Sequence, residues 1–173
     1  MEEVVWQGKW LEMVRKDQWE FVRRRNASGV VAVMAATPAG ELLLVRQFRV
    51  PMGADAIELP AGLVGDHGEE DPLVAANREL EEETGWRAGK LALICKTPSS
   101  AGLTCETVQL VLATELVHVG AGGGIAGEES IKVETIPLRE VHGWLLRQQA
   151  EGTLVDAKIW AALWLLENFE NET

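Results

Sequence analysis

Three glutamates in the middle of the chain are spaced so that they could hold a metal ion. Residues 72–84 are predicted to be helical, which places Glu83 one turn after Glu79 and Glu82 three residues after it. The three carboxylates then converge on one edge of the helix, whereas Glu81 points elsewhere. Because clustered like charges weaken a helix, this packing indicates that a hard divalent cation lies between them.

The same segment carries signals for the start and the end of a helix. Asp71 is a predicted N-cap and Pro72 suits the first helical position, whereas Gly85 can adopt the left-handed conformation that ends a helix. The apolar residues that repeat at helical spacing are Leu73, Ala76 and Leu80. We therefore expect a helix that packs on a sheet by one face and presents carboxylates on another.

The helix and the loop before it resemble the signature of the Nudix family. Residues 78–86 read RELEEETGW, which matches the second half of the Nudix box, R-E-U-x-E-E-x-G-U with U an apolar residue. Glu70 lies eight residues before Arg78, as the box also requires. An ordinary surface helix with a solvated run of glutamates is the alternative. The matching positions of Arg78, Gly85 and Glu70 favour the Nudix interpretation.

The first half of the signature departs from the family pattern. The box has a glycine six positions before the loop glutamate, where this chain has Val64, and Gly62 stands two residues earlier. We interpret the departure as a two-residue lengthening of the loop at residues 65–68, or else as Glu69 taking the role of Glu70. The sequence alone leaves this loop register open.

The resemblance implies a fold and a metal cluster. Nudix proteins are α/β/α sandwiches around a mixed β-sheet, and the residue before the box glycine, here Ala61, lends its carbonyl to the metal ion. The expected cofactor is Mg²⁺, with Mn²⁺ as a substitute. The implied ligands are the carbonyl of Ala61 and the carboxylates of Glu79, Glu82, Glu83 and a late glutamate, Glu129.

Arg78 is expected to support the site without binding metal. It points about 100° away from Glu79 around the helix, which suits the orientation of a loop carboxylate such as Glu70. The alternative is a weak surface ion pair with Glu82, four residues on.

Segments on either side of the box resemble the ADP-ribose pyrophosphatase branch of the family. Residues 46–49 read RQFR and precede an ELPAG strand, as in that branch. Arginines three apart lie on opposite faces of a strand, so one could bind phosphate. The resemblance assigns the diphosphate to Arg49, with Arg46 as a weaker second, and places Glu58 in substrate binding. A solvated strand end is the alternative.

Two further loops carry candidate residues. Ala101 stands where the branch has a proline that is associated with ADP-ribose preference. The replacement of this proline by alanine admits other nucleoside diphosphate sugars. Glu106 is expected to help hold the substrate or a water molecule. A strand-edge acid is the alternative for Glu106. Residues 120–127, GAGGGIAG, are predicted to be a flexible loop that could close over substrate. By resemblance, Glu129 or Glu128 acts as general base; solvated loop acids are the alternative.

The N-terminal residues are predicted to form a separate strand pair. Residues 1–25 alternate loosely between apolar and polar, which indicates two short antiparallel strands. In ADP-ribose pyrophosphatases such a segment, here residues 1–28, makes a homodimer and completes the partner's nucleoside pocket. Trp6, Trp10 or Trp19 could stack on a base, with Trp19 as our candidate; packing at the dimer interface is the alternative.

The remaining elements complete one α/β domain over residues 1–173. Strands are predicted at residues 30–34, 41–45, 91–96, 106–116 and 131–136, and helices at 137–149 and 156–168. The first two strands are too continuously apolar to be half exposed, so we expect them side by side in a sheet with helices on both faces. Predicted core residues of the last helix are Ile159, Trp160, Leu163, Trp164 and Leu166.

Composition excludes several classes of protein. A chain of 173 residues suits one domain, and its net charge of -11 argues against a nucleic-acid-binding surface. No secretory signal or membrane-spanning run is present, so we expect a cytoplasmic protein without a membrane partner. Of the two cysteines, Cys95 is predicted to be a small core residue and Cys105 a loop residue. The histidines lack zinc-site spacing.

The predicted function is Mg²⁺-dependent hydrolysis of the diphosphate bond of a nucleoside diphosphate sugar. ADP-ribose is the leading substrate, with AMP and ribose 5-phosphate as products. One alternative is another Nudix specificity, such as GDP-mannose or a dinucleoside polyphosphate, because the pocket and not the box chooses the substrate. The other is a non-catalytic sensor that only binds ADP-ribose.

Overall fold

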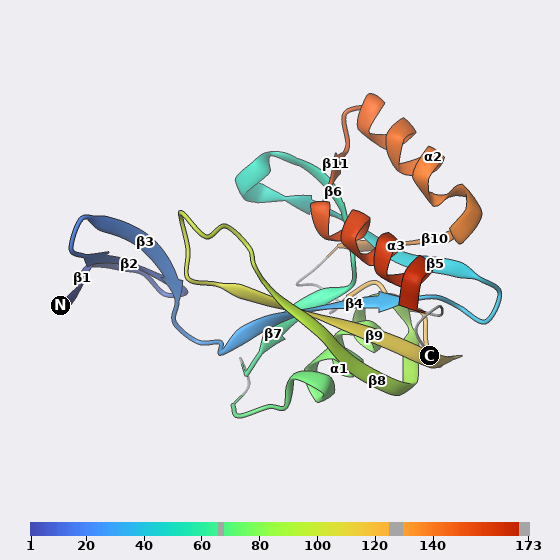
Figure 1. The fold of residues 1–173 in the computed structure, drawn as a ribbon, viewed down its shortest axis with the longest axis horizontal. Coiled ribbons are helices and arrows are strands. Elements are labelled where there is room, and N and C mark those ends of the chain that lie inside the picture. Colours follow the sequence, from blue (N-terminus) through green and yellow to red (C-terminus); the bar gives the residue numbers. More distant parts are fainter. Residues whose placement is uncertain (66–67, 125–129, 170–173) are drawn as a thin grey trace.

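A small antiparallel sheet extends from one side of a larger body in the computed structural model, which describes residues 1–65, 68–124 and 130–169 (Figure 1). The sheet consists of β1 (Glu2–Gln7), β2 (Leu11–Lys16) and β3 (Trp19–Arg24), in that order. The predicted pair is therefore a trio. β2 pairs with both neighbours, and Asp17, at a positive φ of 56°, makes the tight turn into β3.

In the described residues the body contains two four-stranded sheets and three helices. One sheet has the order β10-β5-β6-β11 and the other β7-β4-β9-β8, and each combines parallel and antiparallel pairs. The strands are β4 (Gly29–Ala35), β5 (Glu41–Arg49), β6 (Ala54–Glu58), β7 (Ala61–Val64), β8 (Trp86–Pro98), β9 (Thr107–His118), β10 (Ile131–Pro137) and β11 (Leu154–Val155). The helices are α1 (Pro72–Thr84), α2 (Leu138–Ala150) and α3 (Ala157–Phe169), with a 3₁₀ turn at Val50–Met52.

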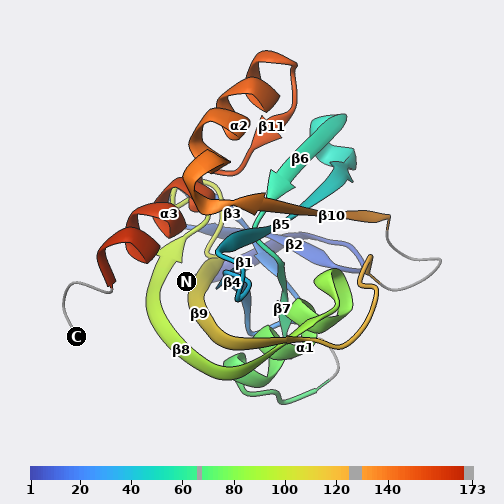
Figure 2. The same ribbon diagram turned by 90° about the vertical axis from the view of Figure 1, so that its right-hand side faces the viewer.

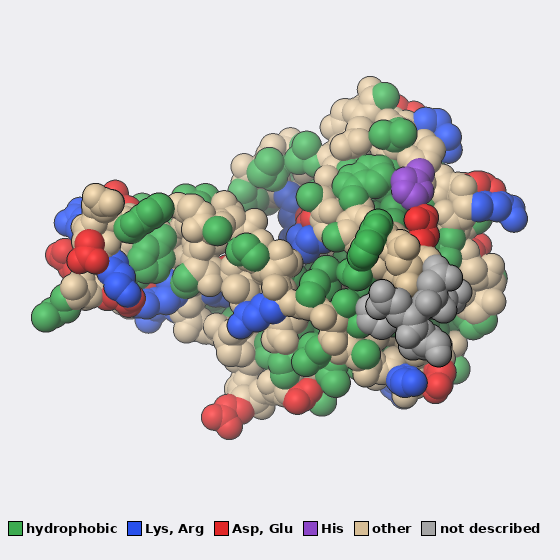
Figure 3. All heavy atoms as spheres, in the orientation of Figure 1, with side chains coloured by type: hydrophobic (Ala, Val, Ile, Leu, Met, Phe, Trp, Pro, Cys, Tyr) green, Lys and Arg blue, Asp and Glu red, His purple; other side chains and the backbone are tan. Residues whose placement is uncertain are grey.

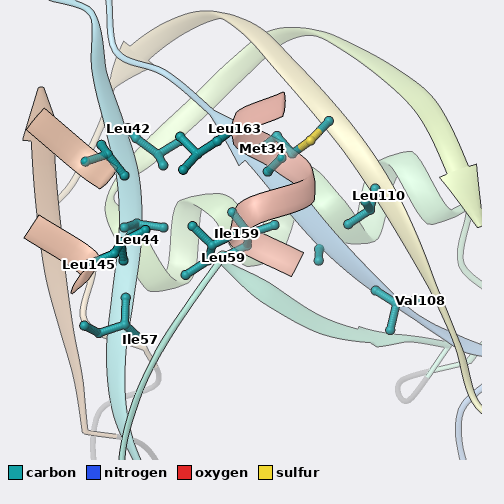
Figure 4. Close-up of a cluster of buried hydrophobic side chains, with 13 residues drawn as sticks. Met34, Leu42, Leu44, Ile57, Leu59, Val108, Leu110, Leu145, Ile159 and Leu163 are labelled. Carbon is teal, nitrogen blue, oxygen red and sulfur yellow. The ribbon is translucent and has the colours of Figure 1, made fainter. Parts of the chain in front are cut away.

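Strand β4 is buried on both faces and separates two cores. Successive strand residues point to opposite faces, so Val31 and Val33 pack toward α1 whereas Ala32 and Met34 pack toward α3. Figure 2 shows α1 on one side of the curved β8 and β9 and α3 on the other. In Figure 4 the α3 side chains lie between those of β5 and those of β9. The predicted α/β/α sandwich is confirmed.

The prediction that β4 and β5 are neighbours in one sheet is wrong. The only pairing between them in the described residues is an isolated bridge from Ala36 to Leu42. Both hydrogen-bonding edges of β4 are already occupied, by β7 and by β9, so β5 must pair elsewhere. The connecting turn does form as predicted, because the amide of Gly40 donates to the carbonyl of Thr37 at 2.9 Å.

Two residues predicted to be buried are exposed. Trp164 on α3 is 64% exposed, because it follows the inward-facing Leu163 and lies about 100° further around the helix. Cys95 is exposed because β8 is an edge strand whose register shifts between Leu93 and Cys95. Cys105 is also exposed, as predicted for a loop residue.

No helix in the described part of the chain is both long and apolar enough to span a membrane.

Candidate active site

Helix α1 begins and ends where the sequence predicts. The carboxylate of Asp71 accepts a hydrogen bond from the amide of Leu73 at 2.8 Å, and Pro72 occupies the first turn. Gly85 ends the helix in the left-handed conformation, with φ at 75°. Ala76 and Leu80 are fully buried against the sheet. The opposite edge of the helix is thereby turned toward β7.

The three predicted carboxylates lie along this edge at different depths. Glu83 is 6% exposed, and its carboxylate accepts the amide hydrogen of Ala61 at 3.0 Å. Glu79 lies against the backbone of Gly62 so closely that a Cβ at that glycine would be 1.9 Å from the Glu79 carboxyl carbon. Glu82 is the most accessible of the three. Strand β7 therefore fixes both inner glutamates.

Arg78 connects these carboxylates to the loop before the helix. Its guanidinium donates two hydrogen bonds to Glu70, at 3.1 and 3.2 Å, and one to the Leu63 carbonyl at 3.2 Å. One nitrogen, Nη1, also contacts Glu79 at 2.7 Å and Glu82 at 3.3 Å. The hydrogen bond to Glu70, with the charge of Glu79, raises the pKa of Arg78 above its ordinary value. The expected contact between Arg78 and Glu70 is present.

Glu70 is the loop carboxylate that contacts Arg78. The amide of Gly68 donates to the Gly65 carbonyl at 3.3 Å. Glu70 accepts hydrogen bonds from Arg78 with both carboxylate oxygens. Glu69 is exposed, and it lines a separate hollow together with Glu70.

The donor set suits a hard divalent cation. In the part of the chain that the structure describes, no three acidic, histidine or cysteine side chains already lie close enough to form a metal cage. However, Nη1 of Arg78 lies within 3.3 Å of both Glu79 and Glu82, so two carboxylates are within reach of a single positive charge. Carboxylate oxygens are the ligands that Mg²⁺ and Mn²⁺ prefer. These residues therefore fit the metal that the box implies.

A cavity of about 850 Å³ opens beside this edge of α1. Lys and Arg side chains are visible in a hollow near the middle of the molecule, below the place of β6 in Figure 1 (Figure 3). Of the residues singled out in the sequence, those that line the cavity are Trp10, Arg49, Glu58, Ala61, Gly62, Arg78, Glu79, Glu82 and Glu106. The structure thus brings most of the predicted site residues to one cavity. Cations line this cavity even though the chain as a whole has a net charge of -11.

One wall of the cavity carries two adjacent ion pairs. Arg49 donates to both carboxylate oxygens of Glu58, at 2.9 and 3.1 Å through Nε. The parallel pairing of Val155 with Ile57 places Asp156 beside Glu58, and Asp156 binds the ammonium and the amide of Lys158. The carboxylates hold these two cations at the cavity surface, where an anionic ligand could meet both.

The opposite wall comes from the N-terminal sheet and β9. Arg24, at the end of β3, forms an ion pair of 3.0 Å with Glu106, just before β9. Trp10 lines the same cavity and is 58% exposed, with the ammonium of Lys9 4.3 Å from its ring centroid. An aromatic face and a cation are thus available on this side.

Several predicted site residues are not brought to the cavity. Arg46 points to the other face of β5, where it contacts Glu134, Thr153 and Gln148. Trp19 lines a separate hollow of about 420 Å³ together with Ala101 and Cys105. Glu128 and Glu129 lie outside the described residues, so their assigned roles stay predictions.

The cavity also contains residues that sequence reasoning missed. Arg24 and the pair Asp156 and Lys158 line it. Of the tryptophans named as candidates for stacking on a base, Trp10 lines the cavity, whereas Trp19 lines the other hollow. Residues 154–158, LVDAK, resemble the end of ADP-ribose pyrophosphatases, which was the one available signal for the pair. No pattern in the sequence distinguishes Arg24 from other strand arginines, because only the tertiary fold brings β3 to Glu106.

A model of the NUDIX domain matches residues 23–161. The chain belongs to the Nudix family. The match takes in helix α1, the loop before it and every residue of the cavity except Trp10. Residues 78–86, which resemble the second half of the Nudix box, and Glu70 lie within this match.

Curated relatives and a solved structure agree with this assignment. ADP-ribose pyrophosphatase of Bacillus subtilis is 39% identical over 112 residues, which cover 65% of this chain and 60% of that protein. ADP-sugar pyrophosphatase of Mus musculus is 32% identical over 92% of this chain and 83% of its own length. GDP-mannose pyrophosphatase of Cronobacter sakazakii is 29% identical over 85% and 79%.

The crystal structure of an ADP compounds hydrolase aligns with 98% of this chain and 91% of its own, with a TM-score of 0.73 and 21% identity. At this identity the likeness concerns the fold. It extends over nearly the whole chain, so the N-terminal sheet is included in the shared architecture.

Substitution of Glu70 tests whether Glu70, and not Glu69, takes the loop position of the box. Replacing Glu70 with Gln removes a charged partner that is 18% exposed and binds Arg78 twice, so we expect a loss of about 1–3 kcal/mol in the free energy of unfolding. Glu69→Gln is the matched control and should change it by less than about 0.5 kcal/mol. Urea denaturation of both variants measures the difference; equal losses would contradict the assigned register.

Proposed function

We propose that this protein hydrolyses the diphosphate bond of a nucleoside diphosphate sugar with the help of Mg²⁺, for which Mn²⁺ can substitute. ADP-ribose is the leading substrate, and AMP and ribose 5-phosphate are the products. The observation that supports this most directly is the cavity itself. It joins the carboxylate edge of α1 to Arg49 and Lys158, two cations suited to an anionic substrate.

The residues of α1 would hold the cation. Glu79, Glu82 and Glu83, with the backbone of Ala61, supply oxygen ligands, and Glu83 is kept in place by the amide of Ala61. A divalent cation bound there neutralises diphosphate charge and lowers the pKa of a water molecule. Arg78 acts as a positioning residue, because it orients Glu79 and Glu82 from the side of the loop.

The cavity walls would hold the substrate. Arg49 and Lys158 meet phosphate oxygens, while Glu58 and Asp156 fix the positions of these cations. Trp10 and Arg24 offer an aromatic face and a charge to the base or the sugar. Proton removal from the attacking water is assigned to Glu129 or Glu128, which remains a prediction. GDP-mannose is the second candidate, because a relative is named GDP-mannose pyrophosphatase.

A panel of nucleotide sugars tests the proposed reaction. The chain is incubated with Mg²⁺ and ADP-ribose, GDP-mannose or a dinucleoside polyphosphate, then with a phosphatase that releases phosphate only from the monophosphate products. We expect release from ADP-ribose above all. Binding of ADP-ribose without turnover of any compound would contradict hydrolysis and favour the sensor.

Substitution of Glu83 tests the role of the carboxylate edge. Glu83→Gln keeps an oxygen that can accept the Ala61 amide, so the fold should persist while kcat falls by orders of magnitude. Glu81→Gln is the matched control, since Glu81 is held by Arg87 away from the cavity. Steady-state kinetics at saturating Mg²⁺ measure both. Unchanged turnover by the Glu83 variant would contradict the proposal.

Substitution of Lys158 tests the substrate wall. Lys158→Met removes a cation from the cavity, and KM should rise roughly 10-fold or more, the effect of one charged hydrogen bond, with a smaller change in kcat. Lys158→Arg keeps the charge and should retain most of the affinity. If both variants bind substrate as well as the original chain, Lys158 has no part in recognition.

We also propose that two copies associate through the N-terminal sheet. Large apolar side chains are exposed on it, and hydrophobic atoms are visible over this part of the molecule in Figure 3. They belong to Val4, Trp6, Trp10, Leu11, Met13 and Trp19. Sedimentation velocity should give a dimer that Trp6→Glu dissociates; a monomer at all accessible concentrations would contradict this.

A further inference from the structure

The end of helix α1 is joined to a glycine segment that the proposed reaction does not use. The last carbonyls of a helix normally lack intrahelical partners. Here the amides of Gly123 and Gly124 donate to the carbonyls of Glu83 and Glu82, at 2.8 and 2.9 Å. The sequence predicts a flexible loop at residues 120–127, but its described part, up to Gly124, is bound to the helix.

The end of α1, at Thr84 and Gly85, packs directly on residues 120–122, backbone against backbone. We call this contact the joint. Gly85 and Gly122 both adopt positive φ, at 75° and 67°. A Cβ at Gly122 would lie 2.4 Å from the Thr84 carbonyl carbon, and one at Gly85 would lie 2.0 Å from the Gly120 carbonyl oxygen. Since the opposing atoms are backbone, no side-chain rotation could relieve these contacts. Two glycines facing each other are therefore required for the segments to touch.

Further hydrogen bonds close the joint. The carbonyl of Gly85 accepts hydrogen bonds from the amides of Val119 and Gly120, at 2.8 and 3.1 Å. The amide of Gly85 itself donates to the carbonyl of Glu81 at 2.8 Å. The amide of Ile131, at the start of β10, reaches the Gly123 carbonyl at 3.4 Å. The residues that follow β9 are thereby bonded to the end of α1, and Gly123 is bonded in turn to the start of β10.

We propose that Gly120–Gly124 is a positioning element for the carboxylates of Glu82 and Glu83. Helix ends fray when their carbonyls are free, and a frayed last turn would let these two side chains change direction. Amides bound to the carbonyls of the same two residues hold that turn in place. This inference rests on the proposed function, because it concerns how the cation ligands of that function are oriented.

Replacement of Gly122 with Ala tests the joint. The added Cβ must push the segment away from α1, so Mn²⁺ binding, followed by electron paramagnetic resonance without substrate, should weaken roughly 10- to 100-fold, as when supporting contacts around metal ligands are lost. Amide hydrogen exchange in the last turn of α1 should accelerate. With substrate, the Mg²⁺ requirement should rise and kcat should fall while KM stays the same.

Gly40→Ala is the matched control. Gly40 has a positive φ of 76°, like Gly122, but a Cβ there meets nothing within 4 Å. It therefore introduces the same backbone strain without the collision. Weaker Mn²⁺ binding in the Gly122 variant alone supports the inference. Unchanged binding in that variant, or equal weakening in both, overturns it.

The joint can also be tested without any variant. In the original chain the amides of Gly123 and Gly124 should be protected from hydrogen exchange like those of α1, although they lie in neither a helix nor a strand. Exchange at the rate of an open loop overturns the inference even if the Gly122 variant fails to fold. These readouts need no substrate, so they remain decisive if no nucleotide sugar is hydrolysed.

Discussion

The guanidinium of Arg78 is the interaction on which the rest of the site depends. It contacts Glu70 in the loop, the carbonyl of Leu63 on β7, and Glu79 and Glu82 on its own helix. One planar cation with several fixed donors thus holds three segments in a single geometry. Without it, several carboxylates would face one another across a partly buried space at a considerable electrostatic cost.

The same geometry requires close approach of backbones, which glycine permits. Gly62 leaves room for the Glu79 carboxylate, and Gly85 and Gly122 let the end of α1 touch the segment before β10. The acidic helix is therefore held at both ends and along one edge. A cavity with Arg49 and Lys158 on its wall then faces carboxylates whose directions are already set. This prior ordering lowers the entropy lost when a cation and a substrate bind.

Local signals predicted both ends of α1, because its cap, its first proline and its final glycine lie in the helix or directly beside it. Long-range features were not accessible in this way. The sheet to which β5 belongs depends on which strands occupy the edges of β4, and Arg24 reaches the cavity only through its pairing with Glu106. Likewise, the two faces of β5 separate Arg49 from Arg46, but the sequence does not say which face lines the cavity.

We propose that the carboxylates supported by Arg78 bind a divalent cation and that hydrolysis of the diphosphate requires this cation. The most direct measurement is chromatography of the products of ADP-ribose with the metal-free chain, before and after addition of Mg²⁺. We expect no reaction in chelator and equal amounts of AMP and ribose 5-phosphate once excess Mg²⁺ is added. Turnover at an undiminished rate in chelator, or none with Mg²⁺, would contradict the proposal.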